Sequence, residues 1–134
     1  MIAAADFLEK HCDAPTLIIG HSLGGAASIF AGNQIPSIQV IATVGALSDP
    51  EHVTHLLSDK VIEIESEGKA VIQIDGRQFI IKKQFLDDLR DHKMLEVLSK
   101  SNKAILVLHS PKDRIVEIEN TAKITFMHGI PSRL

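Results

Sequence analysis

The sequence predicts an α/β fold with about three parallel strands, flanking helices and an inserted β-hairpin. Three observations predict it. Short apolar runs rich in β-branched residues alternate with segments of helical spacing, which is typical of β-α-β units with parallel strands. One of these runs leads through a glycine-rich turn directly into an alanine-rich helix. Two further β-runs are joined by Asp75-Gly76, the strongest short-range signal for a two-residue hairpin.

Length and composition are those of an ordinary soluble domain. The chain has 134 residues, 45% of them hydrophobic, and a formal net charge of -3. It has no basic stripe, so we expect no nucleic-acid partner. No apolar run approaches the roughly 20 residues needed to cross a bilayer, and Asp6 and Glu9 exclude a signal peptide, so we expect no membrane partner. Cys12 is the only cysteine, which favours a reducing, cytoplasmic setting.

The first elements are a short helix, a strand and a second helix. Residues 3–11 have helical spacing, and Asp13-Ala14-Pro15 ends that helix. Residues 16–19 are apolar after Thr16, which predicts a strand buried on both faces. The helix expected at residues 23–32 has small side chains, which allow it to pack closely on the sheet.

The turn between that strand and that helix is Gly20-His21-Ser22-Leu23-Gly24. It matches the nucleophile-elbow pattern, in which a serine is held out of the sheet beside a helix N-terminus. Glycine fits at positions 20 and 24 because we expect a Cβ at either position to crowd the crossing of strand and helix. Ser22 is therefore a candidate nucleophile, and the Leu23 N–H a candidate oxyanion donor. The alternative is that Ser22 is only a capping serine on a tight loop.

The second strand is expected at residues 38–44, where the sequence is mostly apolar and β-branched. A strand, a helix and another strand predict parallel pairing with a right-handed crossover. Ser48-Asp49-Pro50-Glu51 then has the pattern of a helix start, a capping side chain followed by proline and an acid. We expect that helix to run from Pro50 to about Ser58, with residues 60–65 as a continuation.

The hairpin, expected at residues 71–81, interrupts this alternation of strands and helices. We interpret it as a cap-like insertion at about residues 66–84 in a single partial domain that spans residues 1–134. Helical spacing resumes over residues 85–98, with a bend expected at His92-Lys93. The side chains expected to be buried there are Phe85, Leu86, Leu89, Met94, Leu95 and Leu98.

The third core strand is expected at residues 104–109, followed by a turn that contains Asp113 and a last helix ending near Met127. The carboxyl ends of parallel strands meet at one edge of a sheet, so we expect Asp113 and Ser22 to be near neighbours. The order serine before aspartate fits a Ser-Asp-His triad, which makes Asp113 the candidate acid. The alternative is that Asp113 serves only as a turn former or a helix cap.

A histidine base for such a triad has no good candidate in the sequence. It should follow Asp113 on a loop after one more strand, yet the only later histidine, His128, lies at the end of the last helix. His109 stands at a strand end and is interpreted as a rim residue. His21 points the wrong way along the elbow. We therefore expect the general base to be absent.

Two further histidines, His52 and His55, are three residues apart on an expected helix. No second histidine pair and no nearby cysteine supports a metal site there. We interpret them as surface residues, and we expect neither a metal nor a cofactor.

Taken together, these features resemble bacterial α/β-hydrolases, in particular those fused to an OsmC-like domain. The likeness extends to about Met127. It is carried by residues 19–27, 42–46, 49–53, 76–79, 83–89 and 108–113, with Val116, Glu119 and Asn120. The resemblance implies a partial α/β-hydrolase core and a serine hydrolase of the esterase or acyl-hydrolase kind. It implies a small ester-like substrate, with Ser22 as nucleophile and Asp113 as triad acid.

Members of that group also have features that this sequence lacks. They continue into another strand, an Asp-His pair that supplies the base, and a final helix, and they have early strands with an oxyanion loop. We therefore expect a hydrolase domain truncated at both ends, with little or no turnover. The alternative is a non-catalytic remnant or interaction module. In both cases, unpaired sheet edges favour self-association or pairing with another chain.

Overall fold

The structure is a computed structural model that describes residues 1–74 and 76–129. It divides into two compact units, one formed by Met1–Asp49 with the chain from Met94 onward, the other by Pro50–Lys93. The hairpin expected as an insertion lies in the second unit. That residues 1–134 form a single domain with an insertion at about 66–84 stays a prediction.

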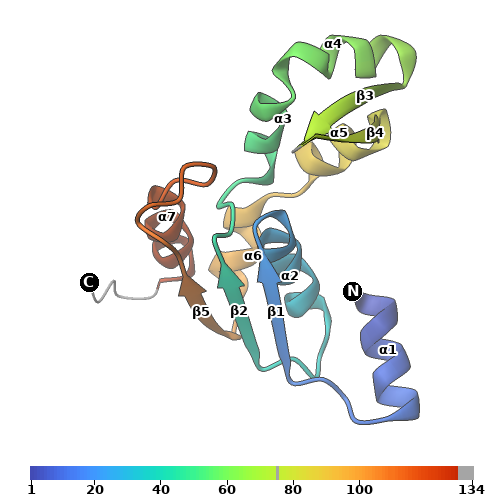
Figure 1. The fold of residues 1–134 in the computed structure, drawn as a ribbon. Coiled ribbons are helices and arrows are strands. Elements are labelled where there is room, and N and C mark those ends of the chain that lie inside the picture. Colours follow the sequence, from blue (N-terminus) through green and yellow to red (C-terminus); the bar gives the residue numbers. More distant parts are fainter. Residues whose placement is uncertain (75, 130–134) are drawn as a thin grey trace. The chain divides into compact units, whose positions relative to one another are not determined.

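The first unit is built on a three-stranded parallel sheet, as the sequence predicts (Figure 1). Its strands are β1 (Leu17–His21), β2 (Val40–Val44) and β5 (Ala104–Leu108), in the order β1-β2-β5. The three strands pair over their full length without an offset, so that His21 lies opposite Val44 and Val44 lies opposite Leu108. Their carboxyl ends therefore lie side by side at one edge of the sheet.

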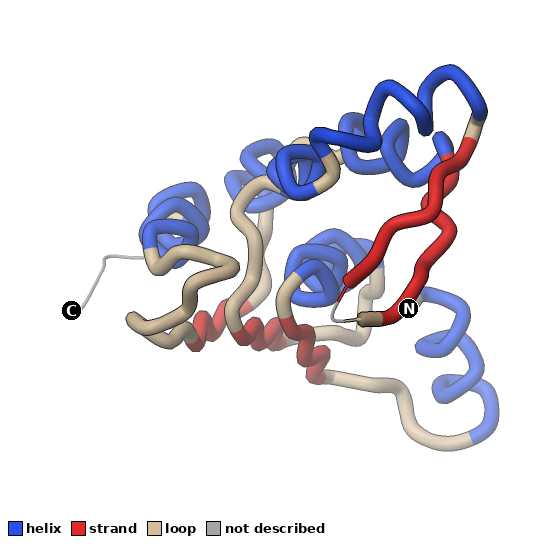
Figure 2. The backbone as a smooth tube through the Cα atoms, turned by 45° about the horizontal axis from the view of Figure 1, so that its top comes forward, coloured by secondary structure: helices blue, strands red, loops and turns tan. Residues whose placement is uncertain are grey.

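Helices cover one face of this sheet. They are α2 (Leu23–Gln34), α6 (Met94–Lys100) and α7 (Glu119–His128), while α1 (Ile2–His11) contributes Ala5 to the same core (Figures 1 and 2). Residues on the covered face alternate with residues on the other face, as the period of a strand requires. The core of the first unit is formed by Ile18, Ile29, Ile41, Met94, Leu98, Ile105, Val107 and Ile124.

The expectation that the first strand is buried on both faces is wrong. Leu17 and Ile19 are 50% and 64% exposed, and Leu106 and Leu108 on β5 are 51% and 49% exposed. These four residues share one face with Ala42 by register. An apolar run predicts that a strand is buried, but it does not say whether this chain supplies the elements that cover both faces. We call Leu17, Ile19, Leu106 and Leu108 the open sheet face.

The second unit has its own small core around an antiparallel hairpin. Its elements are the 3-10 turn η1 (Pro50–His52), α3 (Val53–Leu56), α4 (Ser58–Glu67), β3 (Lys69–Ile74), β4 (Arg77–Lys82) and α5 (Lys83–Asp91). The expected helix from Pro50 is thus divided into three short pieces. Leu57, Ile64, Ala70 and Leu86 form the buried apolar cluster of this unit.

The hairpin prediction is confirmed by the pairing of Ala70 with Ile81 and of Ile74 with Arg77. Gly76 has a φ of +76°, the left-handed conformation that such a turn demands, whereas Asp75 lies outside the described residues.

The bend expected at His92-Lys93 is also confirmed, because α5 ends at Asp91 and α6 starts at Met94. His92 has an extended backbone conformation, which ends α5. Leu86, Leu89, Met94 and Leu98 are buried as expected, but Leu95 is 57% exposed. Nowhere in the described ranges is a helix both long and apolar enough for a membrane span.

Candidate active site

Ser22 connects β1 to α2 with an unusual backbone. Its φ is +54° and its ψ is −126°, and it is the only residue other than glycine with a positive φ in the described part of the chain. Such a conformation costs of order 1–3 kcal/mol and persists only where the surroundings impose it. Here the Ser22 N–H donates to the Val44 carbonyl at 2.9 Å, and the Ser22 carbonyl accepts the Gly25 N–H at 2.9 Å. The strand and the helix thus hold the turn from both sides.

The two glycines of the elbow have different roles. A Cβ on Gly20 would overlap the Gly24 carbonyl oxygen and Ser28 Oγ, so the expected crowding is found there. A Cβ on Gly24 would meet no heavy atom within 4 Å, so the expectation of crowding at Gly24 is wrong. The second close approach is instead at Gly25, where a Cβ would lie 2.7 Å from Ala46 Cβ. The helix therefore contacts β1 through Gly20 and the loop after β2 through Gly25.

The polar groups at the tip of the elbow are unengaged. Ser22 makes no side-chain capping bond, and no described residue hydrogen-bonds its Oγ. Leu23 is the first residue of α2, so its N–H has no acceptor within the helix. No described residue outside the helix accepts from it. A hydroxyl and a free N–H are thus adjacent at a positive helix end.

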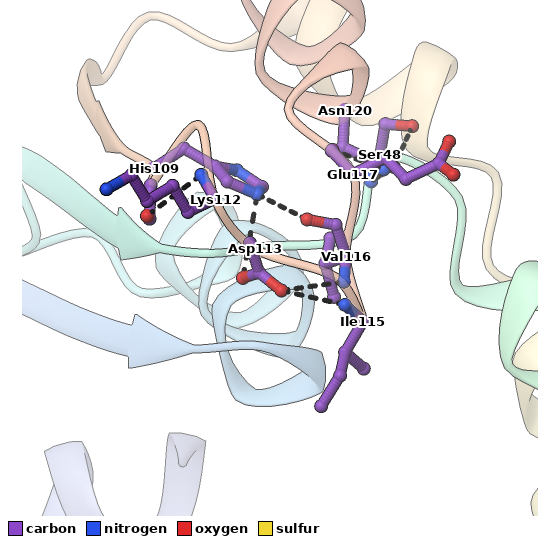
Figure 3. Close-up of polar contacts among 9 residues, drawn as sticks. Ser48, His109, Lys112, Asp113, Ile115, Val116, Glu117 and Asn120 are labelled. Atoms are coloured by element: carbon purple, nitrogen blue, oxygen red, sulfur yellow. Dashed lines mark hydrogen bonds and ion pairs between the residues drawn. The ribbon is translucent and has the colours of Figure 1, made fainter.

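Asp113 lies on the loop after β5, at the same edge of the sheet (Figure 3). Its Oδ1 accepts the N–H groups of Ile115 at 2.9 Å and Val116 at 3.0 Å. Its Oδ2 lies beside Gly45, where a Cβ would come within 3.2 Å of it. Ser22 contacts Val44 and Asp113 contacts Gly45, so both residues lie against the end of β2.

The two N–H donors determine the charge state of Asp113. Hydrogen bonds from Val116 and then Ile115 lower its pKa, partly opposed by desolvation, and the electrostatic effect of the nearby His109 and His21 side chains lowers the pKa further. Because the pKa is lower in the folded chain than in the unfolded chain, ionised Asp113 stabilises the fold above the ordinary aspartate pKa. That contribution is lost as the pH falls through the lowered pKa.

The histidines do not complete a triad. His128 Nε2 lies 3.0 Å from the carbonyl oxygen of Lys103, just before β5 begins. It is therefore at the opposite end of a strand that spans about 13 Å. His109 is not a rim residue, which corrects that expectation: its side chain is 1% exposed and its Nε2 lies 2.7 Å from the Val116 carbonyl oxygen. His21 is exposed.

Metal binding has no support in the described part of the chain, which holds no group of three or more histidine, cysteine, aspartate or glutamate side chains able to bind an ion. The side chains of His52 and His55 lie outside what the structure describes.

A buried polar pair that the sequence did not reveal supports the edge of the site (Figure 3). Ser48, on the loop after β2, donates its N–H and its hydroxyl to Asn120 Oδ1 at 3.0 and 2.8 Å. Asn120 Nδ2 donates to the Glu117 carbonyl at 3.0 Å. The pair joins the loop after β2 to α7. No local pattern could have predicted it, because its members are 72 residues apart.

Comparison with known proteins gives no match to a family model or to a curated protein, but several solved structures are similar. The esterase domain of a Rhodothermus marinus protein is 40% identical with a TM-score of 0.73, over 93% of this chain and 51% of that chain. Alpha/beta hydrolase domain-containing protein 10 from mouse is 20% identical with a TM-score of 0.66, over 93% and 52%. Est1E from Butyrivibrio proteoclasticus is 16% identical with a TM-score of 0.62, over 94% and 53%.

The mouse and Butyrivibrio structures show a shared fold, and the Rhodothermus esterase domain adds a likeness in sequence over most of the chain. The chain spans about half the length of each of these structures. The chain therefore has the fold of an α/β-hydrolase, over about half the length of the solved examples.

Proposed function

We propose that this chain is part of a serine hydrolase of the esterase or acyl-hydrolase kind. Ser22 Oγ attacks the carbonyl carbon of a small ester-like substrate, and the alcohol leaves. Water then hydrolyses the acyl-serine to release the acid. The Leu23 N–H stabilises the oxyanion in both steps, and Asp113 is the acid of the triad.

The backbone of Ser22 is the observation that carries this proposal. A φ of +54° at a serine is a cost that an ordinary capping residue has no reason to bear. It lifts a free hydroxyl to the edge of the sheet where Asp113 also lies. The similar Rhodothermus marinus structure is an esterase domain, which supports the same chemistry.

Turnover by the chain alone should be very low. No described histidine contacts Ser22 Oγ, so nothing in the described ranges takes its proton. Without its base, a triad enzyme retains only the catalysis that binding and the oxyanion hole provide.

A cysteine at the elbow tests the proposal without needing that base, because a thiol ionises far more readily than a hydroxyl. The test protein is Cys12→Ser/Ser22→Cys, and the wild-type thiol of the exposed Cys12 is the matched reference. The helix N-terminus should lower the pKa of the new thiol. We expect p-nitrophenyl acetate to acylate it about three- to tenfold faster at pH 7 than Cys12, as measured by the nitrophenolate burst.

One outcome would contradict the proposed nucleophile, and another would contradict the expected low turnover. A thiol at position 22 that reacts no faster than Cys12 would show that the elbow does not activate a nucleophile. Rapid labelling of the wild-type chain by a fluorophosphonate, lost in Ser22→Ala, would show that turnover has been underestimated and that a base is present.

A second candidate function is that of a non-catalytic interaction module, and the open sheet face favours it. Leu17, Ile19, Leu106 and Leu108 form an apolar face, and among the described strands none pairs with the outer edge of β1 or of β5. The similar solved structures are about twice as long as this chain. The proposed occupant is a polypeptide with the strands and helices that those structures have outside the aligned part. The exposed, lone Cys12 supports a reducing, cytoplasmic setting for this assembly.

The test of this interaction-module proposal begins with the nucleotide sequence on either side of the segment that encodes this chain. We expect it to encode a strand followed by an Asp-His pair, and we expect the two parts together to be monodisperse by light scattering. Leu106→Lys should abolish that assembly, whereas Leu95→Lys, at an exposed position on α6, should not. A homodimer that Leu106→Lys disrupts would identify a second copy as the occupant instead. A monodisperse monomer with a cooperative thermal transition would exclude both.

A further inference from the structure

The loop that carries Asp113 is held from the inside by one buried imidazole. His109 Nε2 lies 2.7 Å from the Val116 carbonyl oxygen, and the side chain is 1% exposed. Because a carbonyl oxygen only accepts, Nε2 carries the proton and donates it. His109 Nδ1 is buried and has no partner among the described atoms. The ring is therefore attached to this loop through Nε2.

Val116 links this imidazole to the carboxylate. Its carbonyl accepts from His109, while its N–H donates to Asp113 Oδ1 at 3.0 Å, beside the Ile115 N–H at 2.9 Å. Figure 3 shows the imidazole and the carboxylate reaching the same short segment of backbone. Within the described part of the chain, Oδ2 accepts no hydrogen bond, and it lies 3.8 Å from His109 Nε2.

We propose that His109 is a positioning residue for Asp113. By holding the Val116 carbonyl, it keeps both N–H groups on Oδ1 and leaves Oδ2 available to the base of the triad. This inference rests on the acid role of Asp113 proposed above. His109 itself touches no reacting atom and acts through the backbone of residues 115–116.

Two replacements that differ only in reach test this role. In His109→Gln, the amide N–H stands about as far from the backbone as Nε2 and can still donate to Val116. In His109→Asn, the amide reaches only as far as Nδ1. His109→Phe keeps a ring of similar size without a donor. None of the three replacements can become charged, so any effect of a histidine charge at position 109 on Asp113 is the same in all of them, and His21 is unchanged throughout.

The readout is the pKa of Asp113, measured by carbon NMR of its carboxyl group, together with hydrogen exchange of the Val116 N–H. We expect His109→Gln to keep the Asp113 pKa below the ordinary aspartate value. His109→Asn and His109→Phe should raise it toward that value, because the N–H donors move off Oδ1. The Val116 N–H should exchange about fivefold faster in the latter two, the factor for one ordinary hydrogen bond.

Three other outcomes would overturn the proposal that His109 positions Asp113. If the Asp113 pKa is as low in His109→Asn as in His109→Gln, the bond to Val116 does not position the acid. If His109→Gln raises the Asp113 pKa as far as His109→Asn does, the hydrogen bond to the Val116 carbonyl is not what keeps that pKa low. If His109→Asn and His109→Phe fail to fold while His109→Gln folds, the bond serves the fold. These readouts do not involve Ser22, so an unreactive thiol at position 22 would overturn the proposed function and leave this result unaffected.

Discussion

Gly20→Ala should destabilise the first unit by about 3 kcal/mol, at the upper end of what overpacking costs. The new Cβ would overlap the Gly24 carbonyl oxygen and Ser28 Oγ. Ser28 is fully buried and donates its hydroxyl to the same carbonyl at 2.8 Å, so neither group has free space to move into. The strand and the helix would have to separate, which would also release the strained turn at Ser22. Urea unfolding followed by circular dichroism measures the change.

Gly24→Ala is the matched control, four residues away in the same elbow. Its Cβ would meet nothing within 4 Å, and its φ is not positive. Alanine is a better helix former than glycine, so this variant should gain about 0.5–1 kcal/mol. Equal destabilisation by the two variants would contradict the close approach at Gly20 and would mean that the motif tolerates no substitution for some other reason.

Asn120→Ala should cost about 2–4 kcal/mol. Asn120 Oδ1 accepts both the N–H and the hydroxyl of Ser48, and Ser48 and Asn120 are 1% and 8% exposed. Removing the acceptor leaves two buried donors without a partner, and each unsatisfied donor costs about 1–3 kcal/mol of stability. We also expect the loop after β2 to loosen, because its bond to α7 is lost. The free energy of unfolding in urea is again the measurement.

Ser48→Ala isolates one of the two bonds. The Ser48 backbone N–H keeps its acceptor, so this variant should lose only about 1 kcal/mol. The double variant should lose less than the sum of the single variants, since the hydroxyl that Asn120→Ala would strand is then absent. If Ser48→Ala costs as much as Asn120→Ala, the amide oxygen is not the shared acceptor.

Local patterns were enough to predict the elements and the edge of the sheet at which the candidate residues meet. β-branched runs indicated the three strands, Asp75-Gly76 indicated the hairpin, and Gly20 to Gly24 indicated a sharp turn from strand to helix. Parallel strands then bring Ser22 and Asp113 to the same end of the sheet without any knowledge of distant contacts. The serine's positive φ follows from that same local turn.

The burial of individual side chains could not be predicted in this way. Leu17 and Ile19 have the composition of a fully buried strand and yet lie on the open sheet face. His109 was expected at the rim, but the loop of residues 113–116 folds back over its ring. The exposure of each of these side chains depends on which other segments of the chain pack over it. The residues next to it in the sequence do not determine that.

The sequence by itself therefore determined the α/β order of the elements, the place of Ser22 on its elbow and the place of Asp113 on the loop after β5. Those features depend on periodicity, turn chemistry and the direction of parallel strands. Only the tertiary structure decided that Gly20 rather than Gly24 is the close contact, that Ser48 is bonded to Asn120, and where the nitrogen atoms of His109 and His128 point. These depend on atoms that meet only after the chain has folded.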